Sequence, residues 1–278
     1  MEGPRKLALK VAERARDFLR SKFLDESYLK VVEEHKSDVS RKIDLEVEDL
    51  IIKTLREEGF KGGIVTEEKG VVGEGPPYAV VDPLDGSLNY AVGSPHWAVS
   101  VAIAEGEDFS TLVASAVCPG FGHPCYSASD KAYSGEGEVI PGAPEKVLVF
   151  YGEPEDERQS KYLVELRKLL GRPKVRVPGA IALDMVNVAR GKLLALVDVR
   201  NKIRNVDVAG AYLIIKRAGV PVPEVYESFP TDEVSVVGNL FFGRDERVLS
   251  ALLSSASKLG LWQGDPDNVQ ARAGRFLP

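Results

Sequence analysis

The order in which helical and strand-like segments follow one another constrains the fold of this chain most strongly. Residues 5–22 place apolar side chains at helical spacing, and a second helix is expected over residues 45–58, ending at Gly59. Short β-rich runs come next, each bounded by Gly, Pro or charged residues. They lie within residues 62–68, 78–83, 97–105, 111–118 and 125–134. This order predicts a pair of helices followed by a meander-like sheet.

The second half of the chain has a different pattern. The sequence PGAP at 141–144 predicts a boundary between an N-terminal α+β lobe, residues 1–142, and a C-terminal α/β lobe, residues 143–278. Strands are expected within residues 146–154, 195–200 and 233–239, and helices within 160–170, 206–219 and 246–259. With 278 residues, 44% of them hydrophobic, the chain can bury a sizeable core.

Charge and hydropathy exclude some classes of partner. The net charge of -6 provides no basic face for a nucleic-acid backbone. No apolar run reaches the length of a membrane span, and the N-terminal segment reads as a charged amphipathic helix without the apolar core of a signal peptide. We therefore expect a cytoplasmic protein that binds neither nucleic acid nor membrane.

The two cysteines, Cys118 and Cys125, bracket a turn between two expected strands. Their spacing does not match a zinc site, which needs further Cys or His ligands at shorter intervals. Two interpretations remain. The favoured one is a pair of buried free thiols, and the other is a disulfide across the hairpin.

The stretch DPLDGS at 82–87 places two carboxylates directly after an apolar run. Because Pro83 has no N–H group, we expect the strand to end there, with Asp82 and Asp85 at its exit. Two carboxylates this close repel unless one is protonated or a cation lies between them. Backbone N–H groups at Gly86 and Ser87 could bind an anion beside such a cation. The pattern suits Mg²⁺ and a phosphate group, and the alternative is an ordinary solvated turn.

Two further acidic positions favour the metal interpretation. Glu67 and Glu68 follow another expected strand. Asp207 precedes an apolar helix expected over residues 209–218. Three separate elements therefore carry carboxylates at their ends.

Together these segments resemble the inositol monophosphatase and fructose-1,6-bisphosphatase superfamily of Mg²⁺-dependent, Li⁺-sensitive phosphatases. The motifs are E-E after a strand, D-P-L-D-G-S-L-N, and V-D-V-A-G-A at a helix start, in that order. Residues 38–44 and 179–185 are similar to two further segments of the family. The resemblance implies a layered αβαβα sandwich.

The resemblance also implies roles for individual residues. Two or three Mg²⁺ ions would be held by Glu67, Asp82, Asp85, Asp207 and the carbonyl group of Leu84. Glu67, Asp44 and Ser87 would activate the attacking water. The substrate would contact Asp85, Gly86, Ser87, Gly179 and Ala180.

One position bears on the substrate. Arg200 stands seven residues before Asp207, where inositol-selective members carry a Glu. A guanidinium group there favours a second anionic group on the substrate. The segment is similar to that of archaeal-type members acting on both fructose 1,6-bisphosphate and inositol 1-phosphate. Lys202, Arg204 and Tyr151 could extend this phosphate pocket, or the basic residues could belong to a solvated loop.

Departures from the family pattern occur at Ser40, Leu88 and Val206, and none removes an implied ligand. Other interpretations remain open. The substrate could be inositol 1-phosphate alone or adenosine 3′,5′-bisphosphate, and some relatives with this fold are non-catalytic binding proteins. Residues 30–42 could form a lid or an ordinary surface loop, and a homodimer or higher homo-oligomer is the family expectation. The three histidines, His35, His96 and His123, lack ligand spacing, so no catalytic role is expected for them.

Overall fold

The computed structural model describes residues 3–34, 39–264 and 269–270. His35, Asp38 and the middle of the segment considered as a lid lie outside these residues. The helices are α1 (Pro4–Lys22), α2 (Lys42–Glu57), α3 (Ser87–Ala91), α4 (Glu157–Leu169), α5 (Ile181–Ala189), α6 (Asn205–Arg217) and α7 (Glu246–Lys258), with the 3-10 turns η1 (Glu26–Tyr28), η2 (Phe109–Thr111) and η3 (Glu224–Ser228).

The larger of two main sheets has eight strands in the order β10-β9-β8-β7-β6-β5-β3-β4. Neighbouring strands are antiparallel except β3 and β5, which are parallel. The strands are β3 (Ile64–Thr66), β4 (Gly70–Val72), β5 (Tyr78–Asp85), β6 (Ala98–Ala104), β7 (Leu112–Pro119), β8 (Tyr126–Ala128), β9 (Ala132–Ser134) and β10 (Gly137–Glu138). The predicted meander is therefore present, with β3 inserted beside β5.

The second main sheet has four strands in the order β12-β11-β13-β15. β11 is parallel to both β12 and β13, whereas β15 is antiparallel to β13. Its strands are β11 (Val147–Tyr151), β12 (Lys174–Arg176), β13 (Ala195–Arg204) and β15 (Val236–Gly243), and two small sheets pair β1 (Val31–Glu34) with β2 (Val39–Arg41) and β14 (Val222–Pro223) with β16 (Val269–Gln270).

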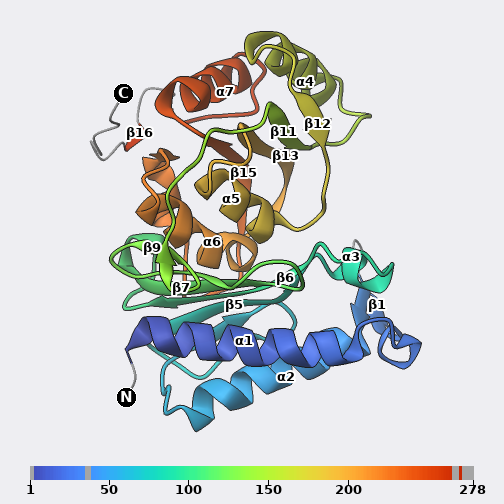
Figure 1. Cartoon of the computed structure of the whole chain (residues 1–278), viewed down its shortest axis with the longest axis vertical. Coiled ribbons are helices and arrows are strands. Elements are labelled where there is room, and N and C mark those ends of the chain that lie inside the picture. Colours follow the sequence, from blue (N-terminus) through green and yellow to red (C-terminus); the bar gives the residue numbers. More distant parts are fainter. Residues whose placement is uncertain (1–2, 35–38, 265–268, 271–278) are drawn as a thin grey trace.

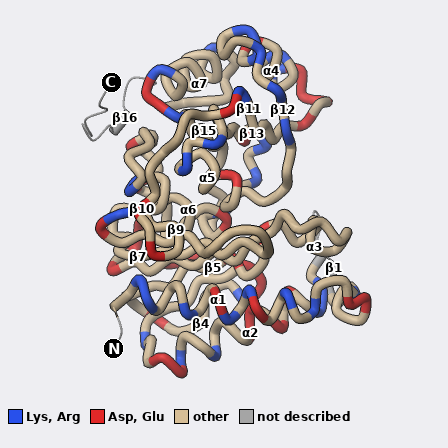
Figure 2. Tube along the Cα trace, viewed as in Figure 1, with Lys and Arg blue, Asp and Glu red and all other residues tan. Residues whose placement is uncertain are grey.

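Helices and sheets alternate in five layers (Figure 1). α1 and α2 cover the outer face of the eight-stranded sheet, and α5 and α6 lie between the two sheets. α4 and α7 cover the far face of the four-stranded sheet. The predicted αβαβα order is confirmed. Acidic and basic residues both occur along the outer helices at the two ends of the molecule (Figure 2).

Three expectations about local structure were wrong. β5 does not end at Pro83: it continues to Asp85, with a register shift between the pairs Asp82–Ser100 and Asp85–Ala98. An irregularity in the ladder accommodates the missing N–H group, as is usual for proline within sheets. α2 and α6 begin three and four residues earlier than expected, because the first turn of each contains an acidic capping residue, Asp44 or Asp207.

The third correction concerns the cysteines. Cys118 and Cys125 form a disulfide across the turn between β7 and β8, so the favoured prediction of two free thiols was wrong. The two Cα atoms are 4.2 Å apart because antiparallel pairing of β7 with β8 brings the strand ends together. Among the described residues, no helix combines the length and the apolar character that crossing a bilayer requires.

Candidate metal and phosphate site

A cavity of about 410 Å³ opens where several elements end close together. β3 and β5 contribute residues at their C-terminal ends, and α3, α6 and the segment before α5 contribute residues at their N-terminal ends. The sequence-predicted residues among its lining are Glu67, Asp82, Leu84, Asp85, Gly86, Ser87, Tyr151, Gly179, Arg200, Arg204 and Asp207. Asp44, Ala180 and Lys202 do not line this cavity.

Three carboxylates converge on one side of the cavity. Glu67, Asp82 and Asp207 each offer an oxygen atom, and these atoms lie within 4.8 Å of one another. Burial raises the pKa of Asp82 well above its ordinary value, and the neighbouring carboxylates raise it further. Burial also raises the pKa of Asp207 to about 6, although Arg204 opposes this shift. Such a cluster is stable only when protons or cations offset the repulsion.

Asp85 lies beside this cluster at the end of β5. Its Oδ2 atom accepts a hydrogen bond of 3.2 Å from the backbone N–H of Leu183 in the first turn of α5. Burial raises the pKa of Asp85, and Asp184 adds to the shift while backbone hydrogen bonds oppose it. Asp85 therefore links the end of the large sheet to the start of α5.

Asp207 and Asp44 occupy equivalent places at two helix starts. Asp207 accepts a 2.8 Å hydrogen bond from the backbone N–H of Arg204, which precedes α6. Asp44 accepts one of 2.7 Å from Arg41, which precedes α2. Burial raises the pKa of Asp44 to about 7, and its Oδ1 atom has no hydrogen-bond partner within the described residues. Asp44 does not line the cavity, but Glu68 and Glu67 lie near enough to raise its pKa further.

The segment from Gly86 leads into α3 and forms the floor of the cavity. Gly86 adopts a φ of 86°, in the left-handed region. A Cβ atom there would lie 3.0 Å from the carbonyl oxygen of Gly179 and 3.1 Å from the Cβ atom of Ala180. Both conditions favour glycine. This close approach explains how Ala180 shapes the site although it does not line the cavity.

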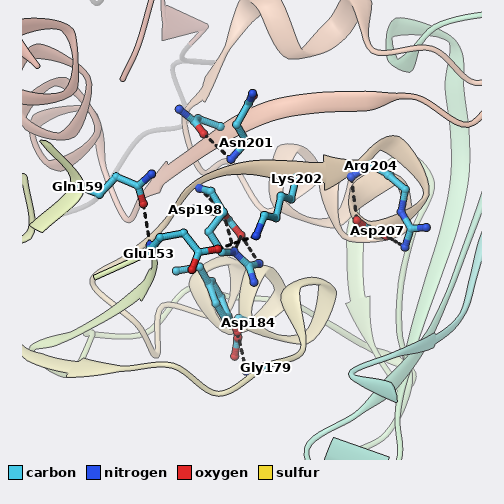
Figure 3. Close-up of polar contacts among 12 residues, drawn as sticks. Glu153, Gln159, Gly179, Asp184, Asp198, Asn201, Lys202, Arg204 and Asp207 are labelled. Carbon is cyan, nitrogen blue, oxygen red and sulfur yellow. Dashed lines mark hydrogen bonds and ion pairs between the residues drawn. The ribbon is translucent and has the colours of Figure 1, made fainter. Parts of the chain in front are cut away.

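The basic residues have different partners, and Lys202 does not line the cavity that Arg200 and Arg204 share. The guanidinium group of Arg200 binds Asp198, with 2.5 Å between Nη2 and Oδ2, and lies over the ring of Tyr151, 4.8 Å from its centroid. Lys202 forms a 2.7 Å ion pair with Glu153 outside the cavity. Arg204 contacts Glu67 and Asp207 of the carboxylate cluster. Figure 3 shows Arg204 and Asp207 facing one another, apart from the group around Asp198.

A buried polar network that sequence reasoning missed supports the opposite wall. Asp184 in α5 accepts a 2.5 Å hydrogen bond from the hydroxyl of Tyr151 and contacts Nε2 of His96 at 3.0 Å. The Tyr151 hydroxyl accepts a 2.7 Å hydrogen bond from the N–H of Gly179. A single acidic residue within the apolar run of residues 180–189 was the available sequence signal. For Asp198 the signal was its place two residues before Arg200, since alternate residues of a strand share one face.

The carboxylate cluster fits a hard divalent cation. Its donors are all oxygen atoms, it is largely buried, and its carboxylates repel one another without a positive charge. Glu67, Asp82, Asp85 and Asp207, with the carbonyl of Leu84, are the residues that could bind such ions.

Comparison with known proteins agrees with this geometry. The family model described as the inositol monophosphatase family matches residues 4–259. The chain belongs to the inositol monophosphatase family. It is a family of metal-dependent phosphatases, in keeping with the acidic cluster.

Similar proteins of this family occur in archaea. The chain is 36% identical over 187 residues to a fructose-1,6-bisphosphatase/inositol-1-monophosphatase of Thermococcus kodakarensis, covering 66% of this chain and 68% of the relative. It is 29% identical to an inositol-1-monophosphatase of Aeropyrum pernix, covering 81% and 85%. A solved inositol monophosphatase–fructose 1,6-bisphosphatase superposes with a TM-score of 0.73 at 25% identity, covering 90% and 98%.

Proposed function

We propose that this protein is a Mg²⁺-dependent phosphomonoester hydrolase that acts on fructose 1,6-bisphosphate and inositol 1-phosphate. The observation that carries the proposal is the convergence of Glu67, Asp82 and Asp207 beside the start of α3. Membership of the family and the names of the archaeal relatives support it.

The metal ligands are proposed as two overlapping sets, for two or three Mg²⁺ ions. Glu67 and Asp82 would hold one ion, and Asp82, Asp85, Asp207 and the Leu84 carbonyl would hold another. When bound, the ions would lower the pKa of a water molecule and offset the charge of the phosphate and of the leaving alkoxide.

The remaining steps fall to the chain itself. The backbone N–H groups of Gly86 and Ser87 would bind phosphate oxygens and orient the phosphorus for in-line attack by water. Ser87 lines the cavity and would pass the proton of the attacking water toward Asp44. The pKa of about 7 suits Asp44 to accept a proton near neutral pH.

The far end of the cavity would bind the rest of the substrate. Gly179 and Arg200 line it, and the ion pair with Asp198 fixes the direction of the Arg200 guanidinium group. A guanidinium group held in one orientation loses little conformational entropy when it binds a second phosphate. This favours a bisphosphate among the candidate substrates.

Phosphate release tests the proposal. The purified protein is incubated with Mg²⁺ and either fructose 1,6-bisphosphate or inositol 1-phosphate, with EDTA in parallel. We expect release that EDTA abolishes, and faster release from the bisphosphate. Release from adenosine 3′,5′-bisphosphate alone would replace the substrate assignment, and no release from any of the three would favour a binding role.

Replacement of Asp85 tests its assignment as a metal ligand. Asp85→Asn should lower kcat by about 1,000-fold or more, because a ligand charge beside the phosphate is lost. The amide oxygen can still accept the hydrogen bond from Leu183, so circular dichroism and the melting temperature should change little. Asp245→Asn, at the exposed start of α7, is the matched control and should keep full activity. Undiminished turnover in Asp85→Asn would reject the ligand assignment.

The assembly proposed is a homodimer or a higher homo-oligomer. Light scattering coupled to size-exclusion chromatography measures the molar mass directly. A mass equal to the 30.3 kDa monomer at micromolar concentration would contradict it.

A further inference from the structure

Arg204 is in contact with the carboxylates that would bind a cation. Its Nη2 atom forms an ion pair with Oε1 of Glu67 and lies 3.5 Å from Oδ1 of Asp207. The guanidinium group also lines the cavity. An arginine guanidinium group stays charged in proteins. Burial lowers the pKa of Arg204, but Asp207 and Glu67 together outweigh that effect, so the net shift is upward.

Arg200, the other arginine of the cavity wall, has different partners. Its Nε atom lies 3.2 and 3.1 Å from the two carboxylate oxygens of Asp198, which is not part of the cation-binding cluster. The two arginines come from the same strand, β13, and form ion pairs with different acidic residues. In Figure 3, Arg204 and Asp207 lie apart from Asp198. Of these two arginines, Arg204 is the one that forms ion pairs with Glu67 and Asp207.

Electrostatics gives Arg204 two opposing effects. Its single positive charge offsets part of the repulsion among three largely buried carboxylates. A divalent ion would bind oxygen atoms of these same residues, at the short distances of about 2.0–2.1 Å that Mg²⁺ requires. Two cations near one pair of carboxylates repel each other, so the guanidinium group must weaken binding of the ion.

The backbone of Arg204 has a separate task. Its N–H group donates to Oδ2 of Asp207 and thereby caps α6. Replacement of the side chain leaves this N–H group in place. The charge of residue 204 can therefore be changed without removing the cap.

We propose that Arg204 is a positioning residue that serves as a built-in counter-cation for Glu67 and Asp207. It stabilises the carboxylate cluster when no metal ion is bound, and it lowers the affinity of the cluster for divalent ions. The inference rests on the proposed function only insofar as the cluster binds such an ion.

Two measurements test the proposal. The first is the affinity for Mn²⁺, obtained from the EPR signal of the free ion, and the second is the melting temperature in EDTA. Four proteins are compared: wild type, Arg204→Gln, Arg204→Lys and Arg200→Gln. Arg204→Gln should bind Mn²⁺ roughly tenfold more tightly, because one opposing unit charge near a carboxylate is worth about one pKa unit or more. In EDTA the same variant should melt about 2–8 °C lower, because the carboxylates lose the positive charge that offsets their repulsion.

The other variants isolate the cause. Arg204→Lys keeps the charge and should stay close to wild type in both measurements, and Arg200→Gln should bind Mn²⁺ as wild type does. Equal or weaker binding by Arg204→Gln would overturn the inference, because the arginine would then assist the ion. If the wild-type protein binds no Mn²⁺, the proposed metal dependence is rejected, and this inference is rejected with it. If Arg204→Gln does not fold in EDTA, Arg204→Met, which has a similar stem and no charge, replaces it. Arg204→Met and wild type are then saturated with Mn²⁺ and titrated with EDTA. We expect the variant to lose the ion more slowly than wild type, and faster loss would contradict the inference.

Discussion

At the scale of single residues, neighbouring carboxylates decide what each arginine of the cavity can do. Arg200 is aligned by Asp198 and by the ring of Tyr151, which is itself held by Asp184. An aligned guanidinium group can bind a distant phosphate of the substrate. If Arg200 binds the second phosphate as proposed, the residues behind it influence specificity without contacting the substrate.

Arg200→Gln gives a prediction for substrate preference. The variant should lose roughly 10- to 100-fold in kcat/KM for fructose 1,6-bisphosphate, since hydrogen bonds between charged groups contribute about 1.5–3 kcal/mol. The loss for inositol 1-phosphate should be several-fold smaller. Lys202→Gln, which changes a residue outside the cavity, is the control. Equal losses on both substrates would show that no second phosphate is bound by Arg200.

Sequence reasoning located the acidic residues of the site better than their partners. Glu67 and Asp207 could be predicted because one follows a strand and the other lies at a helix start. Asp82 could be predicted from the D-P-L-D-G-S motif, although the strand continues past it to Asp85. The ion pair between Arg204 and Glu67 could not be predicted, because the two residues are 137 positions apart and only the packing of two separate elements brings them together. The pairing of Arg200 with Asp198 lies within one strand and was open to prediction.

At the scale of elements, close packing of α6 on the large sheet sets the depth of Asp207. A Cβ atom on Gly210 would lie 2.3 Å from the hydroxyl of Ser100 and 3.2 Å from the backbone nitrogen of Val101. Ser100 is the β6 residue paired with Asp82 in β5. Gly210 lies one turn after Asp207, so this contact fixes the distance between two of the clustered carboxylates.

Gly210→Ala should therefore impair the site from outside it. We expect a stability loss of about 1–3 kcal/mol from overpacking, and up to about 100-fold lower kcat/KM if α6 moves by an ångström. Urea denaturation and steady-state kinetics measure the two effects. Adding Ser100→Gly, which removes the clashing hydroxyl, should restore much of both. An active, fully stable Gly210→Ala protein would mean that the contact is not limiting.

The element order was predictable and some element boundaries were not. Hydrophobic periodicity indicated α1, α4, α7 and most strands of both sheets, but it missed the short strands β4, β10 and β12. The continuation of β5 through Pro83 depends on an irregular register against β6, which no local pattern specifies. α5 was not predicted as a helix because it is buried on nearly all sides, and periodicity indicates only helices with a distinct polar face.

At the scale of the whole molecule, α5 and α6 belong to a core that includes residues of both main sheets. The division into residues 1–142 and 143–278 stays a prediction, and we expect the two lobes to unfold together. Trp97 is buried in the first lobe, and Trp262 contacts Tyr226 and Phe241 in the second. In Trp97→Phe the fluorescence reports on Trp262, and in Trp262→Phe it reports on Trp97. For each variant the urea midpoint from fluorescence should coincide with the midpoint that circular dichroism measures for the same variant. Separate midpoints would indicate independent domains.

Stability of the whole chain should depend on pH and on the metal ion. In the folded chain the pKa of Asp44 is raised to about 7 and that of Asp207 to about 6, whereas the ordinary value of both is 3.8. At a pH between the ordinary and the raised values, the folded chain therefore binds more protons than the unfolded chain. In EDTA the unfolding free energy should therefore fall as pH rises from 5 to 8. Burial lowers the pKa of His123, which opposes this trend below its ordinary value of 6.5.

Denaturant titrations at pH 5, 6, 7 and 8 measure this dependence. Mg²⁺ should restore stability most at pH 8, where it no longer competes with protons. In Asp207→Asn the curve in EDTA should be flatter. A stability in EDTA that rises steadily across this range would contradict the assigned burial of these carboxylates.

The capping geometry of Asp44 and Asp207 has a consequence for how such chains diverge. One oxygen atom of each carboxylate accepts a hydrogen bond from the backbone N–H of the residue that precedes its own helix, whatever the other oxygen binds. Selection for a stable fold alone would therefore retain both residues in a descendant that no longer turns over any substrate. Their presence in a relative is weak proof of activity, and Asp85, which caps no helix of its own in this way, is the better diagnostic position.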